Sequence, residues 1–285
     1  MTHPADLLAA AIRTRNTAAC VGIDPDLPRL PEAVRHCPGS DIQHVRAFCL
    51  GVIDAVADLV PVVKPQSACF ERFGSAGYRV LEDVIARAKE HGLIVILDAK
   101  RGDIDTSARH YACGARAIGA DWITVSPYMG PSTIEPFLEA GLGVFALCRT
   151  SNADSDRLQS LDTGGRTLAD RVAELLSQLG SARAGSCGLS SVGAVVGATR
   201  SPDETRRLRQ AMPSLPFLVP GFGAQGGTLA ALKPMVRADS TDAVSQGLIV
   251  NASRSVLYPP TRPGQDWAEA VRDAARSLVA DLSGL

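Results

Sequence analysis

The sequence contains no apolar stretch longer than about eight residues, whereas a helix that crosses a bilayer needs about 20. It also has no excess of positive charge, since 29 Lys and Arg stand against 30 Asp and Glu and give a formal net charge of −1. That balance excludes a nucleic-acid binder that relies on bulk positive charge, although it leaves room for a local cationic pocket. We therefore expect neither a membrane nor a nucleic-acid partner.

Patterns for disulfide pairing, metal binding and secretion are missing too. The seven cysteines are odd in number and show no Cys-x-x-Cys spacing, and several lie in apolar runs, where a thiol behaves as a small hydrophobic group. We therefore predict reduced thiols in a cytoplasmic protein, with Cys148 in the core. The five histidines have no His-Glu-x-x-His spacing, so we predict no metal site. We expect His110 to lie on a helix surface rather than to act as a catalyst. The first residues lack the basic region of a signal peptide and fit a short amphipathic helix.

What the sequence does contain is a repeated alternation of short apolar runs and longer helical stretches. The runs are continuous rather than alternating, which is typical of strands buried on both faces. Among the helical stretches, one opens with Ser201 followed by Pro202, a favourable helix start. The predicted strands cover 18–24, 62–64, 93–98, 122–126, 143–148, 192–197, 217–220 and 247–251. The predicted helices cover 41–59, 75–90, 166–179, 202–211 and 266–282.

Eight strand-then-helix units in 285 residues are what a (β/α)8 barrel requires. The alternative is a doubly wound sheet, which usually has fewer strands and a Gly-x-Gly-x-x-Gly turn after the first one. Here the first predicted strand runs instead into Gly22-Ile-Asp-Pro-Asp26. We predict an α/β fold with one (β/α)8 TIM-barrel domain over residues 1–285, including the short N-terminal helix. The segment of about 152–190 is either a loop followed by a helix or an insertion.

Charged residues follow several of the predicted strands. Asp24, Lys64 and Asp98 end three of them, and the fifth and eighth strands continue into Arg149 and Arg254. One such residue alone would be interpreted as a solvated strand end. Five of eight strands that end in charged groups predict a functional site instead, because the carboxyl ends of barrel strands meet at one mouth.

The densest cluster of charge is Asp98-Ala-Lys100-Arg-Gly-Asp103. In an extended chain the side chains of Asp98 and Lys100 point to the same side, and Asp103 follows after a turn that Gly102 permits. Two carboxylates around a lysine keep it protonated and hold two negative charges close together. The alternative is a surface salt-bridge cluster, which the apolar run 93–97 directly before it makes less favourable.

A glycine-rich segment, Pro220-Gly-Phe-Gly-Ala-Gln-Gly-Gly227, follows the seventh predicted strand. Its glycines, among them Gly221 and Gly223, allow backbone N–H groups to approach an anion closely. Arg254, after the eighth strand, supplies a cation. Because phosphate sites in TIM barrels commonly lie at the loops after strands seven and eight, the two segments predict a phosphate site.

These residues resemble the orotidine 5′-phosphate decarboxylases, and the resemblance extends from Asp24 to Arg254. Its most specific parts are Leu97-Asp-Ala-Lys-Arg-Gly-Asp-Ile104 and the segment 220–227. The Lys-Arg-Gly-Asp form, together with Cys148-Arg-Thr-Ser-Asn152, is similar to the longer bacterial (type 2) branch. The resemblance implies a TIM barrel, a homodimer, no cofactor, and conversion of orotidine 5′-phosphate to UMP and CO2 in de novo pyrimidine biosynthesis.

The resemblance also implies roles for individual residues. Lys100 corresponds to the proton donor of the charged array, and Asp103 to a carboxylate that reaches the active site of the neighbouring subunit. One position departs from the pattern, since Asp105 stands where many relatives have a small residue and adds negative charge near the implied interface. The implied catalytic residues are Lys64, Asp98, Lys100 and Asp103.

The implied substrate contacts cover the whole nucleotide. Asp24 and Lys64 match residues that contact the ribose hydroxyls, Ser151 matches one that reads the pyrimidine edge, and Gln225 and Arg254 match phosphate ligands. The full implied substrate-binding set is Asp24, Ser107, Ser151, Pro220, Gly221, Gly223, Gln225, Ser253 and Arg254.

The chemistry that the resemblance implies is electrostatic. Loss of CO2 from C6 of the pyrimidine leaves a carbanion that the ring does not delocalise, so an enzyme without cofactor must stabilise that charge directly. Lys100 beside C6 would do so and then deliver the proton, while Asp98 would lie near the departing carboxylate. The required lowering of the barrier approaches about 20 kcal/mol, so binding energy from the remote phosphate would have to contribute.

Two alternatives stay open at this point. A sugar-phosphate decarboxylase or aldolase of the same barrel superfamily would share an Asp-x-Lys-x-x-Asp array but would use a divalent metal. A nucleotide-phosphate binding protein without catalysis would use the charged array only as an interface salt-bridge network. Sensitivity to a chelator distinguishes the first, and binding without turnover distinguishes the second.

Overall fold

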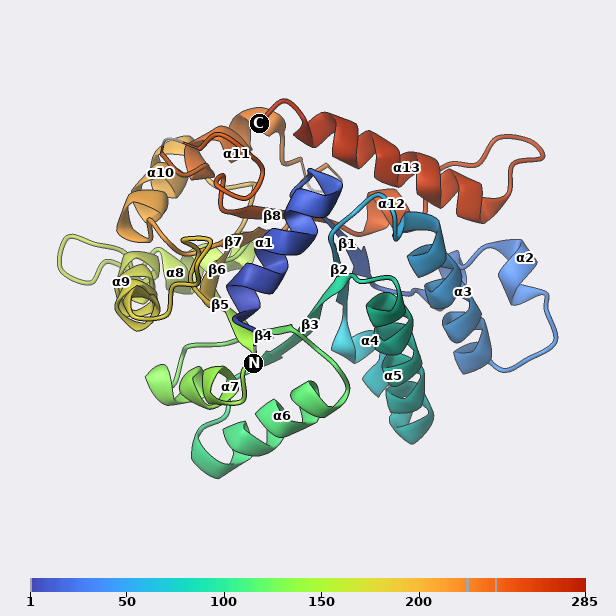
Figure 1. Ribbon diagram of the computed structural model, residues 1–285, viewed down its shortest axis with the longest axis horizontal. Helices are drawn as coiled ribbons and strands as arrows, with labels where there is room; N and C mark the ends of the chain where they lie inside the picture. The colour runs from blue at the N-terminus through green and yellow to red at the C-terminus, as the bar shows by residue number, and fades with distance from the viewer. Residues whose placement is uncertain (1, 224–225, 239) are drawn as a thin grey trace.

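The computed structural model describes residues 2–223, 226–238 and 240–285, and it shows a closed barrel of eight parallel strands (Figure 1). Each strand pairs with the next, and β1 pairs with both β2 and β8. The closed ring confirms the (β/α)8 prediction and excludes the doubly wound sheet. The strands are β1 Ala19–Ile23, β2 Val62–Pro65, β3 Ile94–Arg101, β4 Trp122–Val125, β5 Gly143–Arg149, β6 Val192–Val196, β7 Phe217–Val219 and β8 Leu248–Ala252.

The predicted strands coincide with the observed ones, with ends that differ by three residues or fewer. The continuous apolar runs have a simple cause, because each strand packs against helices on its outer face and against the barrel interior on its inner face. Strand residues such as Val63, Val95 and Val144 lie in the outer core between strands and helices. Cys20, Val62 and Ile94 lie in a second, inner core.

The helices surround the barrel (Figure 1). All five predicted helices are present, and the predicted helix start is confirmed, since the Ser201 hydroxyl accepts a hydrogen bond from the Glu204 N–H (3.3 Å). Helix α6 was not predicted from the periodicity. The long helices are α1 Pro4–Arg15, α3 Asp41–Val56, α5 Gly74–Glu90, α6 Asp105–Ala117, α9 Leu168–Ser181, α10 Pro202–Ala211 and α13 Trp267–Leu282. The short ones are α2 Glu32–Arg35, α4 Ser67–Glu71, α7 Glu135–Glu139, α8 Asp156–Gln159, α11 Leu229–Leu232 and α12 Arg254–Leu257.

Helix α1 closes one end of the barrel. Its buried Leu8 and Ile12 belong to the inner core, which includes residues at the starts of the strands. The Asp6 carboxylate accepts hydrogen bonds from the backbone N–H groups of Cys187 (2.8 Å) and Ser186 (3.1 Å). Those backbone hydrogen bonds, that of Cys187 foremost, lower the pKa of Asp6 to about 2. The amino ends of the strands are therefore covered, and the opposite end is left for a site.

The segment between β5 and α9 holds a 3₁₀ turn at Ala153–Ser155, the short helix α8 and a β-bridge between Asp162 and Thr167. Helix α9 then begins at Leu168, close to the predicted start of a helix at 166. The stretch thus contains a structured loop and a barrel helix. That it is an insertion relative to other barrels stays a prediction.

No helix among the described residues is both long and apolar enough to cross a membrane. All seven cysteines are free thiols. Burial raises the pKa of Cys148 to about 12, which agrees with its predicted place in the core. His110 lies exposed on α6, as the sequence predicts.

Candidate active site

A buried carboxylate, Asp98, lies at the centre of the open end of the barrel. Its Oδ2 accepts hydrogen bonds from Lys64 Nζ (2.7 Å) and Gln66 Nε2 (3.1 Å). Its Oδ1 accepts from Lys100 Nζ (2.7 Å) and Thr124 Oγ1 (2.8 Å). The four donors come from β2, its extension, β3 and β4, so three neighbouring strands position one charged cluster.

Charge dominates this cluster. Burial on its own would raise the pKa of the Asp98 carboxyl, but the charges of Lys64 and Lys100 outweigh it and hold that pKa well below its ordinary value. Burial would likewise lower the pKa of the Lys64 ammonium, but the charges of Asp98 and Asp24 raise it above its ordinary value. The surroundings of Lys64 and Asp98 therefore both favour the charged form of each group.

The backbone at Lys100 is not extended, so the expectation of a regular strand is wrong there. Lys100 has a φ of +45°, in the left-handed region, and the pairing of β3 with β4 shifts register between Leu97 and Arg101. The Thr124 hydroxyl accepts a hydrogen bond from the Lys100 N–H (3.0 Å), which holds the unusual conformation. The side chains of Asp98 and Lys100 still meet, because the bulge turns the lysine back toward the carboxylate. A non-glycine residue in this region stores backbone strain, which is commonest at functional sites.

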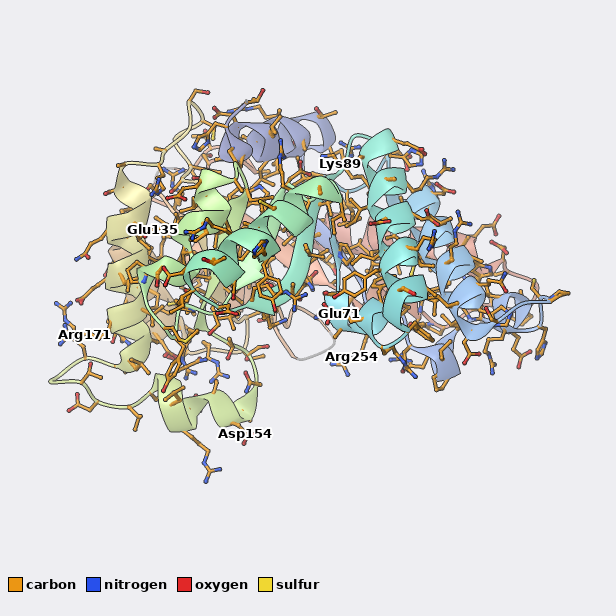
Figure 2. All side chains as sticks on the ribbon, turned by 90° about the horizontal axis from the view of Figure 1, so that it is seen from below. Glu71, Lys89, Glu135, Asp154, Arg171 and Arg254 are labelled. Carbon is orange, nitrogen blue, oxygen red and sulfur yellow. The ribbon has the colours of Figure 1, made fainter. Side chains whose placement is uncertain are left out.

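Two hollows meet at the cluster. The first, of about 310 Å³, lies over β1 and β8, and we call it the β8 hollow. The second, of about 510 Å³, lies over β4 to β6, and we call it the β5 hollow. Lys64, Asp98 and Pro220 line both, so the charged cluster forms their shared wall. In the stick view Arg254 of the first hollow and Asp154 of the second lie at one end of the molecule, with Lys89 near the other (Figure 2).

Asp24 lines the β8 hollow with one carboxylate oxygen, Oδ1, buried and without a hydrogen-bond partner among the described residues. A buried carboxylate oxygen that lacks a partner is costly. Hydroxyl groups of a bound ligand would satisfy it. The nearby Tyr258 hydroxyl is already engaged, since it accepts from the Asp26 N–H (2.7 Å).

The glycine-rich segment after β7 borders the β8 hollow through Pro220, Gly221 and Phe222. Gly221 and Gly223 have positive φ values of +93° and +70°, as the sequence suggests for such a turn. The N–H groups of Gly223 and Gly227 donate to carbonyls within the segment (both 3.0 Å). In this conformation those groups brace the turn rather than point at an anion. Gln225 lies outside the described residues.

Arg254, which the sequence predicts as the cation of a phosphate site, lies at the β8 hollow. Arg254 lines the β8 hollow together with Ser253, and its exposed guanidinium makes no ion pair with any described residue. Ser253 has a buried neighbour, Asn251, whose amide donates to its hydroxyl (3.3 Å). The β8 hollow is thus lined both by an arginine that makes no ion pair with a described residue and by a carboxylate oxygen of Asp24 that has no hydrogen-bond partner among them.

The sequence of the barrel matches a known family model, described as "Orotidine 5'-phosphate decarboxylase / HUMPS family", over residues 20–269. The chain belongs to this family. Among curated relatives, proteins named orotidine 5′-phosphate decarboxylase from Rhodopirellula baltica and Aromatoleum aromaticum are 40% and 45% identical. The first alignment covers all of both chains, and the second covers 96% of each.

Solved structures agree with this membership of the decarboxylase / HUMPS family. Leishmania donovani OMP decarboxylase superposes with a TM-score of 0.80 at 32% identity, and covers 99% of this chain and 98% of its own. A putative orotidine 5′-phosphate decarboxylase from Streptomyces avermitilis has a TM-score of 0.81 at 35% identity, over 100% of this chain and 96% of its own. The family resemblance seen in the sequence is confirmed.

Two residues of the family motif lie away from both hollows. The Asp103 carboxylate accepts a hydrogen bond from the Ile104 N–H (2.9 Å) and, among the described residues, makes no ion pair with Lys100. Ser107 is exposed on the first turns of α6 and lines neither hollow. Asp105, where the resemblance implies a small residue, has a φ of +48°, a conformation that glycine adopts without strain because it lacks a Cβ.

Sequence reasoning missed three residues that complete the site in this family member. Gln66 and Thr124 both donate to Asp98, and Gly22 packs so closely under Ser253 that a Cβ would lie 2.0 Å from its hydroxyl oxygen. Gln66 lies two residues beyond Lys64, and that spacing on an extended chain is the signal that would have found it. Thr124 is the one polar residue inside the apolar strand Trp122–Val125.

Among the described residues, no group of three or more His, Cys, Asp or Glu side chains is placed to hold a metal ion.

Proposed function

We propose that this chain decarboxylates orotidine 5′-phosphate to UMP and CO2 in cytoplasmic de novo pyrimidine biosynthesis, without a cofactor. The observation that carries the proposal is the ion-paired cluster of the buried Lys64 and Asp98, which line both hollows, with the exposed Lys100, which lines the β5 hollow. Relatives named orotidine 5′-phosphate decarboxylase, which align with this chain over 96% or more of its length, support this reaction.

The shapes of the two hollows suggest how the nucleotide lies. The phosphate would bind Arg254 in the β8 hollow, and the ribose hydroxyls would satisfy the buried oxygen of Asp24 beside Lys64. The pyrimidine would enter the β5 hollow, whose walls include the apolar side chains of Leu147, Val195, Leu218 and Leu158 and the hydroxyl of Ser151. In this arrangement C6 of the ring would lie next to the charged cluster.

The proposed chemistry follows from that placement. The bond between C6 and the carboxyl carbon breaks, CO2 leaves, and the electron pair stays on C6. The Lys100 ammonium stabilises that developing charge and then transfers one of its protons to C6, so no other acid is required. Asp98, fixed by Gln66 and Thr124, faces the departing carboxylate and favours its loss.

The test of this proposal is decay of the orotidylate absorbance band with purified protein, with and without EDTA. Equal, rapid decay in both samples supports a cofactor-free decarboxylase. Decay abolished by EDTA and restored by Mg²⁺ would point instead to a metal-dependent sugar-phosphate type of enzyme. Tight UMP binding without decay would leave a nucleotide-binding protein.

Arg254→Ala is expected to raise the KM for orotidylate by about 10-fold to 100-fold, because a charge-assisted hydrogen bond to phosphate contributes about 1.5–3 kcal/mol. The measurement is initial rate against substrate concentration. Arg262→Ala is the matched control, since Arg262 is also exposed but lies outside the hollow. An unchanged KM in Arg254→Ala would remove the arginine from the phosphate site.

We also propose that the protein is a homodimer and that Asp103 and Ser107 serve the partner's site. Asp103 lies half-buried in the loop after β3, and Ser107 is exposed on the first turns of α6, which follows that loop. Around this loop several large apolar side chains are exposed, and the loops after β3 and β4 are joined by the hydrogen bond from Ser126 N to Arg101 O (2.6 Å). The exposed apolar residues are Ile104, Tyr111, Tyr128 and Met129. Large apolar side chains exposed on neighbouring elements support an interface at this face.

Mixed dimers test the shared site. Lys100→Ala and Asp103→Ala are each expected to be nearly inactive, but co-expression with two different tags should recover about one quarter of wild-type activity, since half the dimers carry one intact site of two. The recovered activity must co-purify with both tags. If each site were built from one chain, the mixture would show only the mean of the two inactive parents.

A further inference from the structure

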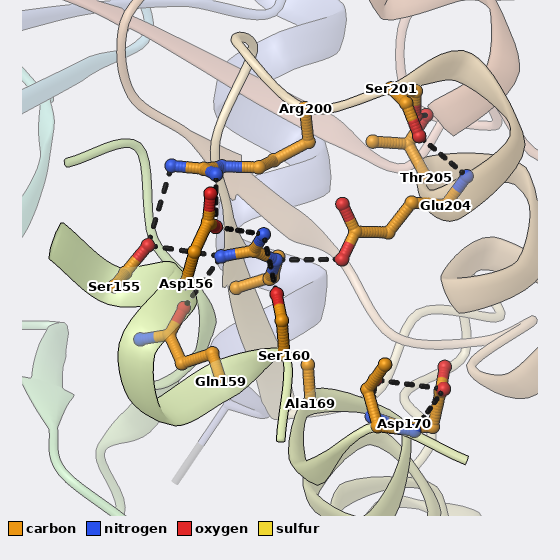
Figure 3. A network of polar contacts seen from close by, with 12 residues as sticks. Ser155, Asp156, Gln159, Ser160, Ala169, Asp170, Arg200, Ser201, Glu204 and Thr205 are labelled. Atoms are coloured by element: carbon orange, nitrogen blue, oxygen red, sulfur yellow. Dashed lines mark hydrogen bonds and ion pairs between the residues drawn. The ribbon is translucent and has the colours of Figure 1, made fainter. Parts of the chain in front are cut away.

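One wall of the β5 hollow is a short segment, residues 150–160, that is held from behind by two arginines, of which Arg149 is buried and Arg200 is partly buried. Ser151, Leu158 and Gln159 of this segment line the hollow. Helix α8 within it has only four residues, too few for a helix to be stable by itself. The wall therefore depends on the polar contacts behind it, which Figure 3 shows.

Arg149, the last residue of β5, is the centre of these contacts, with only 4% of its side chain exposed. Its guanidinium donates to Glu204 Oε1 (2.6 Å), to Ser155 Oγ (2.9 Å) and to the carboxylate of Asp156. In Figure 3, Ser155 and Asp156 lie on one side of the network and Glu204 on the other. Arg149 thus ties the wall to α10, on the outside of the barrel.

Arg200 makes the second set of contacts. It donates to Asp156 Oδ1 (2.8 Å) and to the backbone oxygen of Asn152 (2.9 Å). Its side chain is 9% exposed. One exposed carboxylate, Asp156, is therefore shared by the guanidinium groups of Arg149 and Arg200, which fixes both ends of the turn Ala153–Ser155 and the start of α8.

Gln159 connects these contacts to the β5 hollow through two hydrogen bonds with Thr150. Its Oε1 accepts from the Thr150 N–H (2.9 Å) and its Nε2 donates to the Thr150 hydroxyl (3.0 Å). Arg149 Nη1 lies 3.4 Å from the same Oε1. The side-chain amide thereby fixes the residue directly before Ser151.

The other side of Ser151 is also confined. Its backbone oxygen accepts a hydrogen bond from the Thr199 hydroxyl (3.2 Å). Gly197 packs so tightly that a Cβ there would lie 2.8 Å from the Ser151 Cα. Ser151 thus has one wall made by the end of β6 and the other made by Thr150 and Gln159.

We propose that Gln159 is a positioning residue, which acts through Thr150 to hold the Ser151 hydroxyl at the pyrimidine, with Arg149 as its anchor. The proposal rests on the proposed function, in which Ser151 contacts the base. Gln159 need not touch the substrate. Its effect on catalysis is expressed through Ser151, and that dependence is what an experiment can measure.

A double-mutant cycle tests the link. Gln159→Ala and Ser151→Ala are each expected to lower kcat/KM for orotidylate by about 10-fold, the effect of one or two lost hydrogen bonds. The double variant should be about as active as Ser151→Ala alone, because Gln159 has nothing left to position. Thr150→Val, which removes only the hydroxyl partner, should behave like a weaker Gln159→Ala and serves if the latter does not fold.

Ser160→Ala is the matched control. Ser160 contacts the same Arg149 guanidinium (3.2 Å), yet lies outside the hollow. It should leave kcat/KM unchanged. The proposal would be overturned if the double variant lost kcat/KM by the product of the two single losses, or if Ser160→Ala lost as much kcat/KM as Gln159→Ala. Gln159 would then be a purely structural residue.

The same proteins are titrated with UMP by calorimetry, so that the cycle is also measured in binding. If wild type does not turn over orotidylate, the proposed function fails, whereas coupling between Gln159 and Ser151 in the UMP dissociation constant still supports positioning. Additive effects on UMP binding overturn positioning even when turnover is normal.

Discussion

Replacing Lys100 by alanine is expected to lower kcat for orotidylate by about 10⁴-fold, since the ammonium both stabilises the carbanion and supplies the proton. The hydrogen bond of 2.7 Å from its Nζ to Asp98 Oδ1 holds the ammonium beside that carboxylate at the β5 hollow. The measurement is decay of the orotidylate absorbance band at saturating substrate, beside a UMP titration that reports whether the site still forms.

The control for this variant is Lys233→Ala, since Lys233 is exposed and far along the chain from the charged cluster. It should leave kcat unchanged. A Lys100→Ala protein that binds UMP normally and retains more than about one hundredth of wild-type kcat would contradict the role of Lys100 as the proton donor, because general acid catalysis alone accounts for about 10²-fold or more.

Asp98→Asn is expected to have the second large effect, on stability as well as on turnover. The Lys64 side chain is 6% exposed and would keep its charge with its main partner neutralised. Breaking a buried ion pair by removal of one partner costs about 3–5 kcal/mol. Urea unfolding should show that loss, while Asp83→Asn, at an exposed ion pair with Arg46, should lose less than about 1 kcal/mol.

The loss in Asp98→Asn should depend on pH in a defined direction. The pKa of Asp98 is lowered in the folded state, so its stabilisation is complete above the unfolded pKa of about 3.9 and is lost as the pH falls toward the folded value. The gap in free energy of unfolding between wild type and variant should therefore be constant from pH 7 to pH 5 and shrink below it. The pKa of Lys64 is raised, so its contribution persists up to its unfolded pKa of about 10.4 and beyond. If the difference in free energy of unfolding between wild type and Asp98→Asn instead grew as the pH fell, Asp98 would not be a stabilising ionised carboxylate.

The barrel and the place of its site were accessible from the sequence because both rest on local patterns. A strand buried on two faces must be continuously apolar, and a charged residue at its end is conspicuous for that reason. Asp98 and Lys64 stood out in this way. Their hydrogen bond joins residues 34 apart in the sequence, and the topology of parallel strands brings such residues together.

The parts that could not be predicted depend on contacts without a local pattern. The left-handed backbone at Lys100 depends on a register shift against β4 and on the Thr124 hydroxyl. Arg149 stood out in the sequence as a strand end and as part of a family motif, but neither pattern predicts that it organises the wall of the β5 hollow through Asp156 and Glu204. The role of Asp103 involves a second copy of the chain, which a pattern in one chain suggests only through resemblance to a family.

Helix α1 also sets the order in which the molecule is completed. It is synthesised before the other described elements, yet Asp6 pairs with backbone groups 180 and 181 residues later, and β1 cannot close the ring until β8 exists. A helix of 12 residues is marginal alone, so α1 gains its stability only from this late surface. Contacts of such separation slow folding. We therefore expect ring closure and the docking of α1 to be the final steps, with Leu8 and Ile12 left exposed to the solvent, or to a chaperone, until the last strand leaves the ribosome.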